Sequence, residues 1–237
     1  MSEGPKLITH SDPKSPISEA YRILRTNIQF AGLDKPLKRV AITSSIPGEG
    51  KSTTMANLGV TMAQAGTKVI IVNADLRRPF IGKLFGLSEH IGLTTVLMGR
   101  VSLDEVIMPT AVPNLFVLPS GPIPPNPSEL LGSQAMANLL AELDKKADIV
   151  LIDCPPVIAV ADTAILAPKV DGIILLARIG HVPKDLVLKT KANLEAAKAR
   201  ILGVVASRVK IQGSHNYYYY YYYYYSEDKK PEGKGTR

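Results

Sequence analysis

The stretch Arg39-Val-Ala-Ile-Thr-Ser-Ser-Ile-Pro-Gly-Glu-Gly-Lys-Ser-Thr-Thr54 decides the expected fold. Its apolar run, residues 40–42, is typical of a short buried parallel strand, and the residues after it cannot continue that strand. Apolar residues then recur at helical spacing from Met55 to Ala63, and Gly66 stands where a helix C-cap is expected. A strand, a glycine-containing turn and a helix in this order predict a loop that binds phosphate.

This turn, residues 45–52, is called the phosphate loop below. The backbone N–H groups of residues 47–52 and the helix N-terminus are expected to form a concave, positively polarised nest for a polyphosphate. Lys51 would reach the β- and γ-phosphates, and the Ser52 hydroxyl would bind Mg²⁺. The usual pattern has glycine at the first position of the loop, where this chain has Ser45. The alternative, a chance Gly-Lys-Ser in a surface turn, is disfavoured by the flanking strand and helix.

Composition restricts the possible classes of protein. A chain of 237 residues accommodates one α/β domain with a sizeable core. The formal charge is +7, but the basic residues are scattered rather than arranged in a stripe, and we expect no nucleic-acid partner. Cys154 is the only cysteine, which excludes an internal disulfide and a Cys-x-x-Cys metal site. The sequence has neither the apolar core of a signal peptide nor a run of about 18 apolar residues that could span a membrane, so we expect a cytoplasmic location.

Apolar runs and amphipathic stretches alternate along the chain. Strands are expected at 69–72, 115–118, 149–153, 172–177 and 201–206, and helices at 18–30, 133–146 and 184–199, with short helices within 80–108. This alternation predicts an α/β fold with a mostly parallel, doubly wound sheet and helices on both faces. The expected domain spans residues 17–212, between a flexible segment (1–16) and a disordered tail (213–237).

Two carboxylates follow strands of this predicted sheet. Asp75 lies just after the strand at 69–72, and Asp153 ends the strand at 149–153. Groups past the carboxyl ends of parallel strands converge on the ligand crevice. Asp153 is therefore favoured as a Mg²⁺-holding residue over a turn former. Asp162 is left open between a helix cap and a site residue.

The first expected helix begins with Ser18 as its N-cap and ends near Phe30. Its apolar side is expected to carry Ala20, Ile23, Leu24 and Ile28. At about 100° per residue, Glu19, Arg22 and Arg25 fall on another side and face solvent or a partner. On this spacing alone, the solvated alternative is favoured.

Nine consecutive tyrosines lie near the C-terminus of the chain. They are Tyr217, Tyr218, Tyr219, Tyr220, Tyr221, Tyr222, Tyr223, Tyr224 and Tyr225. A packed core cannot use nine adjacent phenols, since each buried hydroxyl needs a partner. The run is either a low-complexity, β-prone segment without function or a cluster of phosphoacceptors. Each phosphate would add about −1.5 to −2 charges.

Together these features resemble the cytoplasmic bacterial tyrosine autokinases of capsule and exopolysaccharide synthesis, which are P-loop proteins. The resemblance covers roughly residues 15–225. Its five motifs are Pro47–Thr53 (Walker A), Val69–Arg77 (Walker A′), Ile149–Pro156 (Walker B), Glu19-x-x-Arg22-x-x-Arg25 and the tyrosine cluster.

The resemblance implies an ATP- and Mg²⁺-dependent protein-tyrosine kinase. ATP would be bound by Pro47, Gly48, Glu49, Gly50, Lys51, Ser52 and Thr53. Catalysis would use Lys51, Asp75 and Asp153, and Mg²⁺ would be held by Ser52, Asp75 and Asp153. Glu19, Arg22 and Arg25 would join subunits in a homo-oligomeric ring that feeds one tail into the neighbour's site. The implied partners are a transmembrane activator or polysaccharide co-polymerase at the inner face of the cell membrane, and a tyrosine phosphatase.

The chain departs from that family at two places. The A′ box usually reads Asp-x-Asp, and Asn73 stands at its first acidic position. The strand at 201–206 is often followed by an adenine-reading asparagine, where this chain has Ser207 and Arg208. A nucleotide-switched scaffold of the partition-ATPase type is the competing hypothesis, although it leaves the tyrosine run unexplained. An iron–sulfur carrier on the same fold would need paired cysteines.

Overall fold

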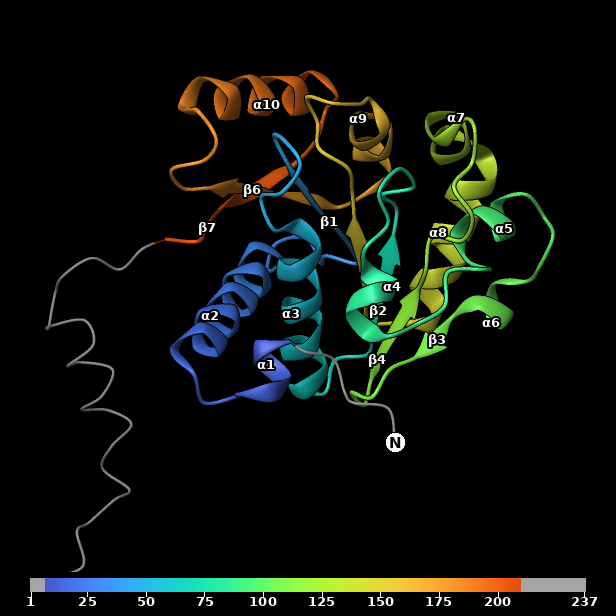
Figure 1. The fold of residues 1–237 in the computed structure, drawn as a ribbon, viewed down its shortest axis with the longest axis horizontal. Coiled ribbons are helices and arrows are strands. Elements are labelled where there is room, and N and C mark those ends of the chain that lie inside the picture. Colours follow the sequence, from blue (N-terminus) through green and yellow to red (C-terminus); the bar gives the residue numbers. More distant parts are fainter. Residues whose placement is uncertain (1–6, 210–237) are drawn as a thin grey trace, which may run out of the picture. The chain divides into compact units, whose positions relative to one another are not determined.

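The computed structural model describes residues 7–209, so the tyrosine run and the rest of the predicted tail lie outside the described residues. Within them, a seven-stranded sheet has the order β3-β4-β2-β5-β1-β6-β7 (Figure 1). The strands are β1 (Arg39–Ser44), β2 (Val69–Asn73), β3 (Met108–Pro109), β4 (Leu115–Leu118), β5 (Ile149–Asp153), β6 (Gly172–Arg178) and β7 (Ile201–Ser207). All pairs are parallel except β3–β4. The predicted doubly wound sheet is thus confirmed, and β3 is an addition.

Helices connect the strands in the predicted alternation. They are α1 (Ile8–Ser11), α2 (Pro16–Ala31), α3 (Lys51–Gln64), α4 (Ile81–Phe85), α5 (Leu93–Leu97), α6 (Leu103–Val106), α7 (Pro127–Gly132), α8 (Gln134–Lys146), α9 (Asp162–Leu166), the 3-10 helix η1 (Ala167–Lys169) and α10 (Lys184–Ala196). No helix among residues 7–209 has the length and apolar character needed to cross a bilayer.

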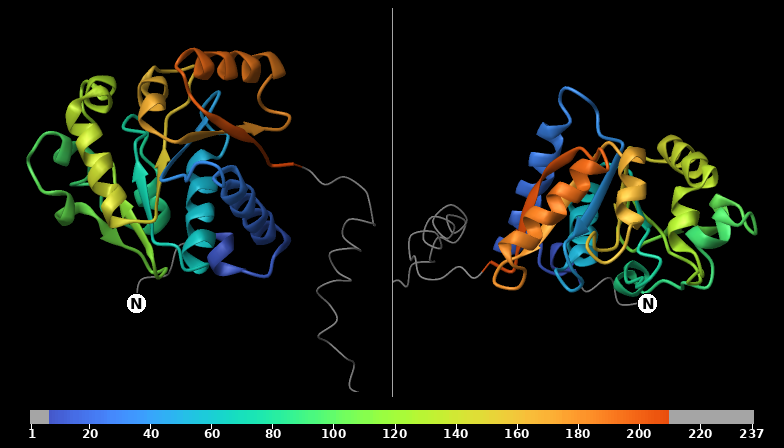
Figure 2. Two further views of the ribbon diagram at one scale, coloured as in Figure 1. Left: turned by 180° about the vertical axis from the view of Figure 1, so that it is seen from behind. Right: turned by 90° about the horizontal axis from the view of Figure 1, so that it is seen from above.

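Helices lie on both faces of the sheet (Figure 2). Two hydrophobic cores, one on each face, pack these helices against it. Alternate residues of the central strands point to opposite faces; in β2, for example, Ile70 joins one core and Ile71 the other. The first core includes residues from α5, α6, α7, α8, α9 and α10, and the second includes residues from α2, α3 and α4. The continuous burial of β1, β2 and β5 explains why these strands read as unbroken apolar runs.

Helix α3 packs unusually closely on β2. A Cβ added at Gly59 would lie 2.7 Å from Ile71 Cδ1, so a larger residue there would require the Ile71 side chain to shift. The absence of a side chain at Gly59 thus lets Ile71 of β2 pack directly against the backbone of α3.

The N-terminal part of the domain differs from the prediction. Within residues 7–16, expected to be flexible, Ile8–Ser11 form α1 and Pro16 begins α2, and Leu7 is buried. The Thr9 N–H and hydroxyl both donate to Asn57 Oδ1 on α3, at 3.1 and 2.9 Å. The N-cap of α2 is Ser15, whose side chain accepts from the Ser18 N–H, so the prediction of Ser18 as the cap is wrong.

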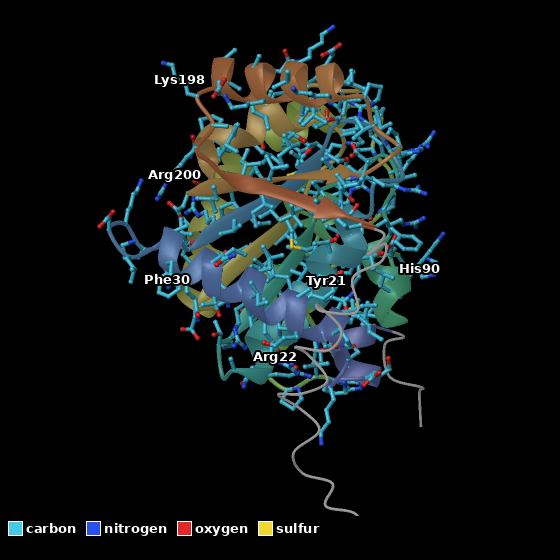
Figure 3. All side chains as sticks on the ribbon, turned by 90° about the vertical axis from the view of Figure 1, so that its left-hand side faces the viewer. Tyr21, Arg22, Phe30, His90, Lys198 and Arg200 are labelled. Carbon is cyan, nitrogen blue, oxygen red and sulfur yellow. The ribbon has the colours of Figure 1, made fainter. Side chains whose placement is uncertain are left out.

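The orientation of α2 also differs from the prediction. Ile28 is buried, but Ile23 is 50% exposed and Phe30 is 64% exposed, so the helix leaves apolar surface uncovered. Arg25 is turned inward instead, and its Nη1 donates to the Thr61 carbonyl on α3 at 2.9 Å. Figure 3 shows Arg22 and Phe30 on the same side of the molecule as β7.

Candidate active site

The phosphate loop joins β1 to α3 at the carboxyl edge of the sheet. Gly48 and Gly50 have φ angles of +82° and +102°, a left-handed conformation that favours glycine. The first backbone bond of α3 runs from the Thr54 N–H to the Gly50 carbonyl (2.9 Å). The preceding N–H groups are the ones that a helix start leaves for an anion.

Lys51 and Asp75 are brought together by the fold, as the sequence predicts. Lys51 begins α3, and its Nζ lies 3.8 Å from Asp75 Oδ2, with each side chain only 8% exposed. The other carboxylate oxygen of Asp75 accepts from the Arg78 N–H at 3.1 Å. The ammonium group thus lies between the phosphate loop and the loop that follows β2.

Asp153 and Ser52 form the second contact of the site. The Ser52 hydroxyl donates to Asp153 Oδ2 at 2.6 Å, and Asp153 is fully buried at the end of β5. Burial raises the pKa of Asp153 to about 6, and nearby Lys51 and the Ser52 hydrogen bond oppose that rise. The next residue, Cys154, is also buried; its N–H donates to the Ile42 carbonyl (3.0 Å), and burial raises the pKa of its thiol.

Asn73 lies beside Asp153 in the sheet. The two are register partners across β2 and β5, and both are fully buried. Neither the amide nitrogen nor the oxygen of Asn73 has a hydrogen-bond partner within residues 7–209, and the same holds for Asp153 Oδ1. Buried polar atoms without partners are costly and uncommon. These three atoms are available to contact a polar ligand.

The oxygen atoms of this site fit a Mg²⁺ ion. The part of the chain that the structure describes has no cluster of three or more His, Cys, Asp or Glu side chains that could hold a metal. Mg²⁺ does not require such a cluster, because it is usually bound by one or two carboxylates together with water and substrate phosphates. Ser52 and Asp153, with the unpartnered Oδ1, supply that kind of donor set.

Glu49 occupies an unexpected place within the phosphate loop. Its carboxylate is fully buried and accepts the Ile46 N–H at 2.8 Å and the Arg178 N–H at 2.9 Å. Its side chain is therefore engaged by the protein, whereas the neighbouring Pro47, Gly48 and Thr53 are exposed.

Arg77 forms a contact that sequence reasoning missed. Its guanidinium donates to both carboxylate oxygens of Asp162, from Nε at 2.9 Å and from Nη2 at 3.0 Å. Asp162 is fully buried, is the first residue of α9, and also accepts from the Ser128 hydroxyl at 2.6 Å. Asp162 is thus not the cap, which is Ala161. No local spacing connects Arg77 with Asp162, which lie 85 positions apart.

The remaining predicted residues lie outside this cluster. Glu19 and Arg22 form an ion pair on α2 at 2.6 Å, and Arg22 also donates to the Pro13 carbonyl. Ser207 ends β7, and its hydroxyl donates to the Glu49 carbonyl at 2.8 Å. Tyr217 to Tyr225 are not among the described residues.

Comparisons with known proteins identify the family to which this chain belongs. A family model described as "AAA domain" matches residues 37–179. Tyrosine-protein kinase YwqD of Bacillus subtilis is 44% identical over 211 residues, which cover 89% of each chain. The crystal structure of the chimerical protein CapA2B2 superposes with a TM-score of 0.83 at 43% identity, covering 86% of this chain and 89% of that one.

The kinase domain of the Escherichia coli tyrosine kinase ETK gives a TM-score of 0.81 at 33% identity, over 88% of this chain and 83% of that one. The chain therefore belongs to the bacterial tyrosine-protein kinases, a family of enzymes built on a nucleotide-binding P-loop domain.

Proposed function

We propose that this protein is an ATP-dependent autokinase that phosphorylates the tyrosines of its own C-terminal cluster, Tyr217–Tyr225, and thereby regulates the synthesis and export of capsule or exopolysaccharide. One observation carries the proposal: Lys51, Asp75, Ser52 and Asp153 converge at one edge of the sheet, from three separate segments of the chain.

Each side chain of the cluster has a distinct role in phosphoryl transfer. The Lys51 ammonium binds the transferred phosphate and neutralises its charge, next to the N–H groups at the start of α3. Ser52 and Asp153 would hold Mg²⁺, which when bound supplies charge neutralisation between the phosphates. Asp75 helps to hold the metal or accepts the proton of the tyrosine hydroxyl. Such a reaction depends on positioning and charge more than on covalent catalysis.

The tyrosine cluster explains why a kinase would need no exact acceptor position. In a run of nine tyrosines, a shift by one residue still presents a hydroxyl. Five phosphates at about −1.5 to −2 charges each outweigh the formal +7 of the whole chain. Phosphorylation would therefore change the protein from basic to acidic.

We further propose that the acceptor tail comes from a neighbouring subunit in a homo-oligomeric ring. Helix α2 supports this, because its exposed apolar residues Ile17, Ile23 and Phe30 are uncovered within the described chain. The Glu19–Arg22 ion pair on the same helix adds polar groups suited to a subunit contact. Arg25 would contribute indirectly, through its bond to the Thr61 carbonyl.

The proposed setting is the cytoplasmic face of the cell membrane. A transmembrane activator or polysaccharide co-polymerase would recruit the kinase there, and a tyrosine phosphatase would reset the tail. The protein CapA2B2 is described as chimerical, which is in keeping with a kinase that works together with a second protein. Nucleic acid is not a proposed partner, given the scattered basic residues.

The experiment is incubation of the full chain with Mg²⁺-ATP, with and without a cytoplasmic activator peptide, followed by intact-mass spectrometry. Lys51→Ala is the inactive variant, and Lys191→Ala, an exposed lysine on α10, is the matched control. A ladder of phosphates on Tyr217–Tyr225 that is absent only in Lys51→Ala supports the proposal. ATP binding without any ladder would favour the nucleotide-switched scaffold.

Transfer between subunits needs a mixed sample. Isotopically heavy Lys51→Ala protein is mixed with light, active protein before ATP is added. Phosphate on the heavy chain supports transfer in trans, and phosphate confined to the light chain contradicts it.

A further inference from the structure

Glu49 carries a buried negative charge that the roles described so far do not use. Both of its carboxylate oxygens accept backbone N–H groups, one from Ile46 at 2.8 Å and one from Arg178 at 2.9 Å. No lysine or arginine forms an ion pair with it within residues 7–209. A buried carboxylate held by backbone alone is expensive unless its hydrogen bonds are well formed.

The three contacts of Glu49 join separate parts of the domain. Ile46 lies at the beginning of the phosphate loop, and Arg178 is the last residue of β6. The Glu49 carbonyl oxygen accepts from the hydroxyl of Ser207, the last residue of β7, at 2.8 Å. One residue of the loop is thus bonded both to the loop itself and to the ends of two neighbouring strands.

We propose that Glu49 is a positioning residue, which fixes the phosphate loop against the ends of β6 and β7 in the shape that binds phosphate. Gly48 and Gly50 flank it at φ angles of +82° and +102°, so the backbone turns sharply on both sides of Glu49. That turn places the carboxylate inside the protein and leaves the loop's N–H groups for the nucleotide. A loop already held in its bound shape loses less freedom when the ligand arrives.

The hydrogen bond from Ser207 to Glu49 connects the phosphate loop to the last strand of the sheet. The chain leaves the sheet at Ser207, so the strand that leads to the tyrosine-rich segment is bonded directly to the phosphate loop. The Ser207 O–H is committed as a donor to Glu49, although its oxygen can still accept. Ser207 is therefore a second positioning residue for the loop.

The test measures nucleotide binding rather than kinase activity. The inference rests on the proposed function, because the test requires that the wild-type protein binds ADP. Glu49→Gln keeps the size of the side chain, but its NH₂ group would face one of the two N–H donors. Glu142→Gln, the same substitution at an exposed position on α8, is the matched control. ADP affinity without Mg²⁺ is measured by titration calorimetry on the full chain, and folding is checked by the melting temperature.

We expect Glu49→Gln to weaken ADP binding by about tenfold or more, because a hydrogen bond to a charged group is lost and a donor is left unpaired. Glu142→Gln should bind ADP as the wild type does. Folded Glu49→Gln that binds ADP within about twofold of the wild type would overturn the proposal.

Ser207→Ala keeps the carboxylate and tests the same arrangement if Glu49→Gln fails to fold. It should weaken ADP binding by about threefold to tenfold, since one neutral hydrogen bond is lost. Unchanged affinity in Ser207→Ala, with Glu49→Gln unfolded, would limit Glu49 to a role in folding and reject the proposal. A wild type that binds no ADP would instead refute the proposed function.

Discussion

Replacing Asn73 with aspartate would restore a second carboxylate beside Asp153 and test the electrostatics of the site. The two positions are register partners on adjacent strands, which lie about 4.8 Å apart. Two unit charges about 5 Å apart repel by about 3 kcal/mol at an effective dielectric constant near 20. We therefore expect Asn73→Asp to destabilise the metal-free protein by up to about 3 kcal/mol near pH 8, a limit reached if both carboxylates are charged.

The assay is thermal unfolding with and without Mg²⁺. For a chain of this size, about 3 kcal/mol corresponds to a loss of about 6–12 °C in the melting temperature. Mg²⁺ places a double positive charge between the carboxylates, so the ion should restore most of that loss and bind the variant more tightly than the wild type. Asn138→Asp, the same substitution at an exposed position on α8, is the control and should shift the melting temperature little.

Two results would refute this reasoning. One is an Asn73→Asp variant as stable as the wild type without metal, which would mean that the two side chains do not share one electrostatic environment. The other is an equal loss of stability with and without Mg²⁺, which would mean that the metal does not bind between them.

Three further predictions concern pH, the Arg77 contact and self-association. Because the folded pKa of Asp153 (about 6) lies above its unfolded value (about 3.9), its contribution to stability is complete below about pH 4 and is lost as pH rises through 6. In denaturant unfolding, the free energy of unfolding of the metal-free wild type should fall by about 3 kcal/mol over this range, and Asp153→Asn should show no such fall. Arg77→Ala leaves the buried Asp162 carboxylate without its cation and should lower the free energy of unfolding by about 2 kcal/mol, a value discounted because the arginine is partly exposed. Adding Asp162→Asn should recover part of this loss, and a double variant as unstable as Arg77→Ala alone would argue against the pairing. Ile23→Ser should weaken self-association in light scattering while changing the stability of the monomer by less than about 0.5 kcal/mol, and unchanged association would remove α2 from the proposed interface.

The parts of the fold predicted from sequence are those whose signals are local. The central strands are buried on both faces, so each one shows as a continuous apolar run, and the structure has a strand at each of the five later runs. Strand β3 has only two residues, one of them Pro109, and exists because β4 pairs with it. Residues 7–16 are polar and proline-containing, and they are ordered by contacts such as that of Thr9 with Asn57, which no local pattern reveals.

The residues of the candidate site likewise fall into those that local motifs predict and those that depend on distant partners. The phosphate loop and the carboxylates at the strand ends follow from short motifs, because the parallel sheet brings all strand ends to one edge. The positions of Glu49 and Arg77 could not be predicted, since their partners lie 129 and 85 residues away. The orientation of α2 was predicted wrongly because spacing separates the sides of a helix without saying which side is covered.

The buried thiol of Cys154 has a practical consequence for studying this protein. It is the chain's only cysteine, it follows Asp153 directly, and burial keeps it protonated. An alkylating reagent can reach it only when the carboxyl edge of the sheet opens, so the labelling rate reports how often that opening occurs. No engineered probe is required, and there is no second thiol to confuse the signal. The unmodified protein thus carries its own kinetic reporter, a few bonds away from the residue that is expected to hold the metal.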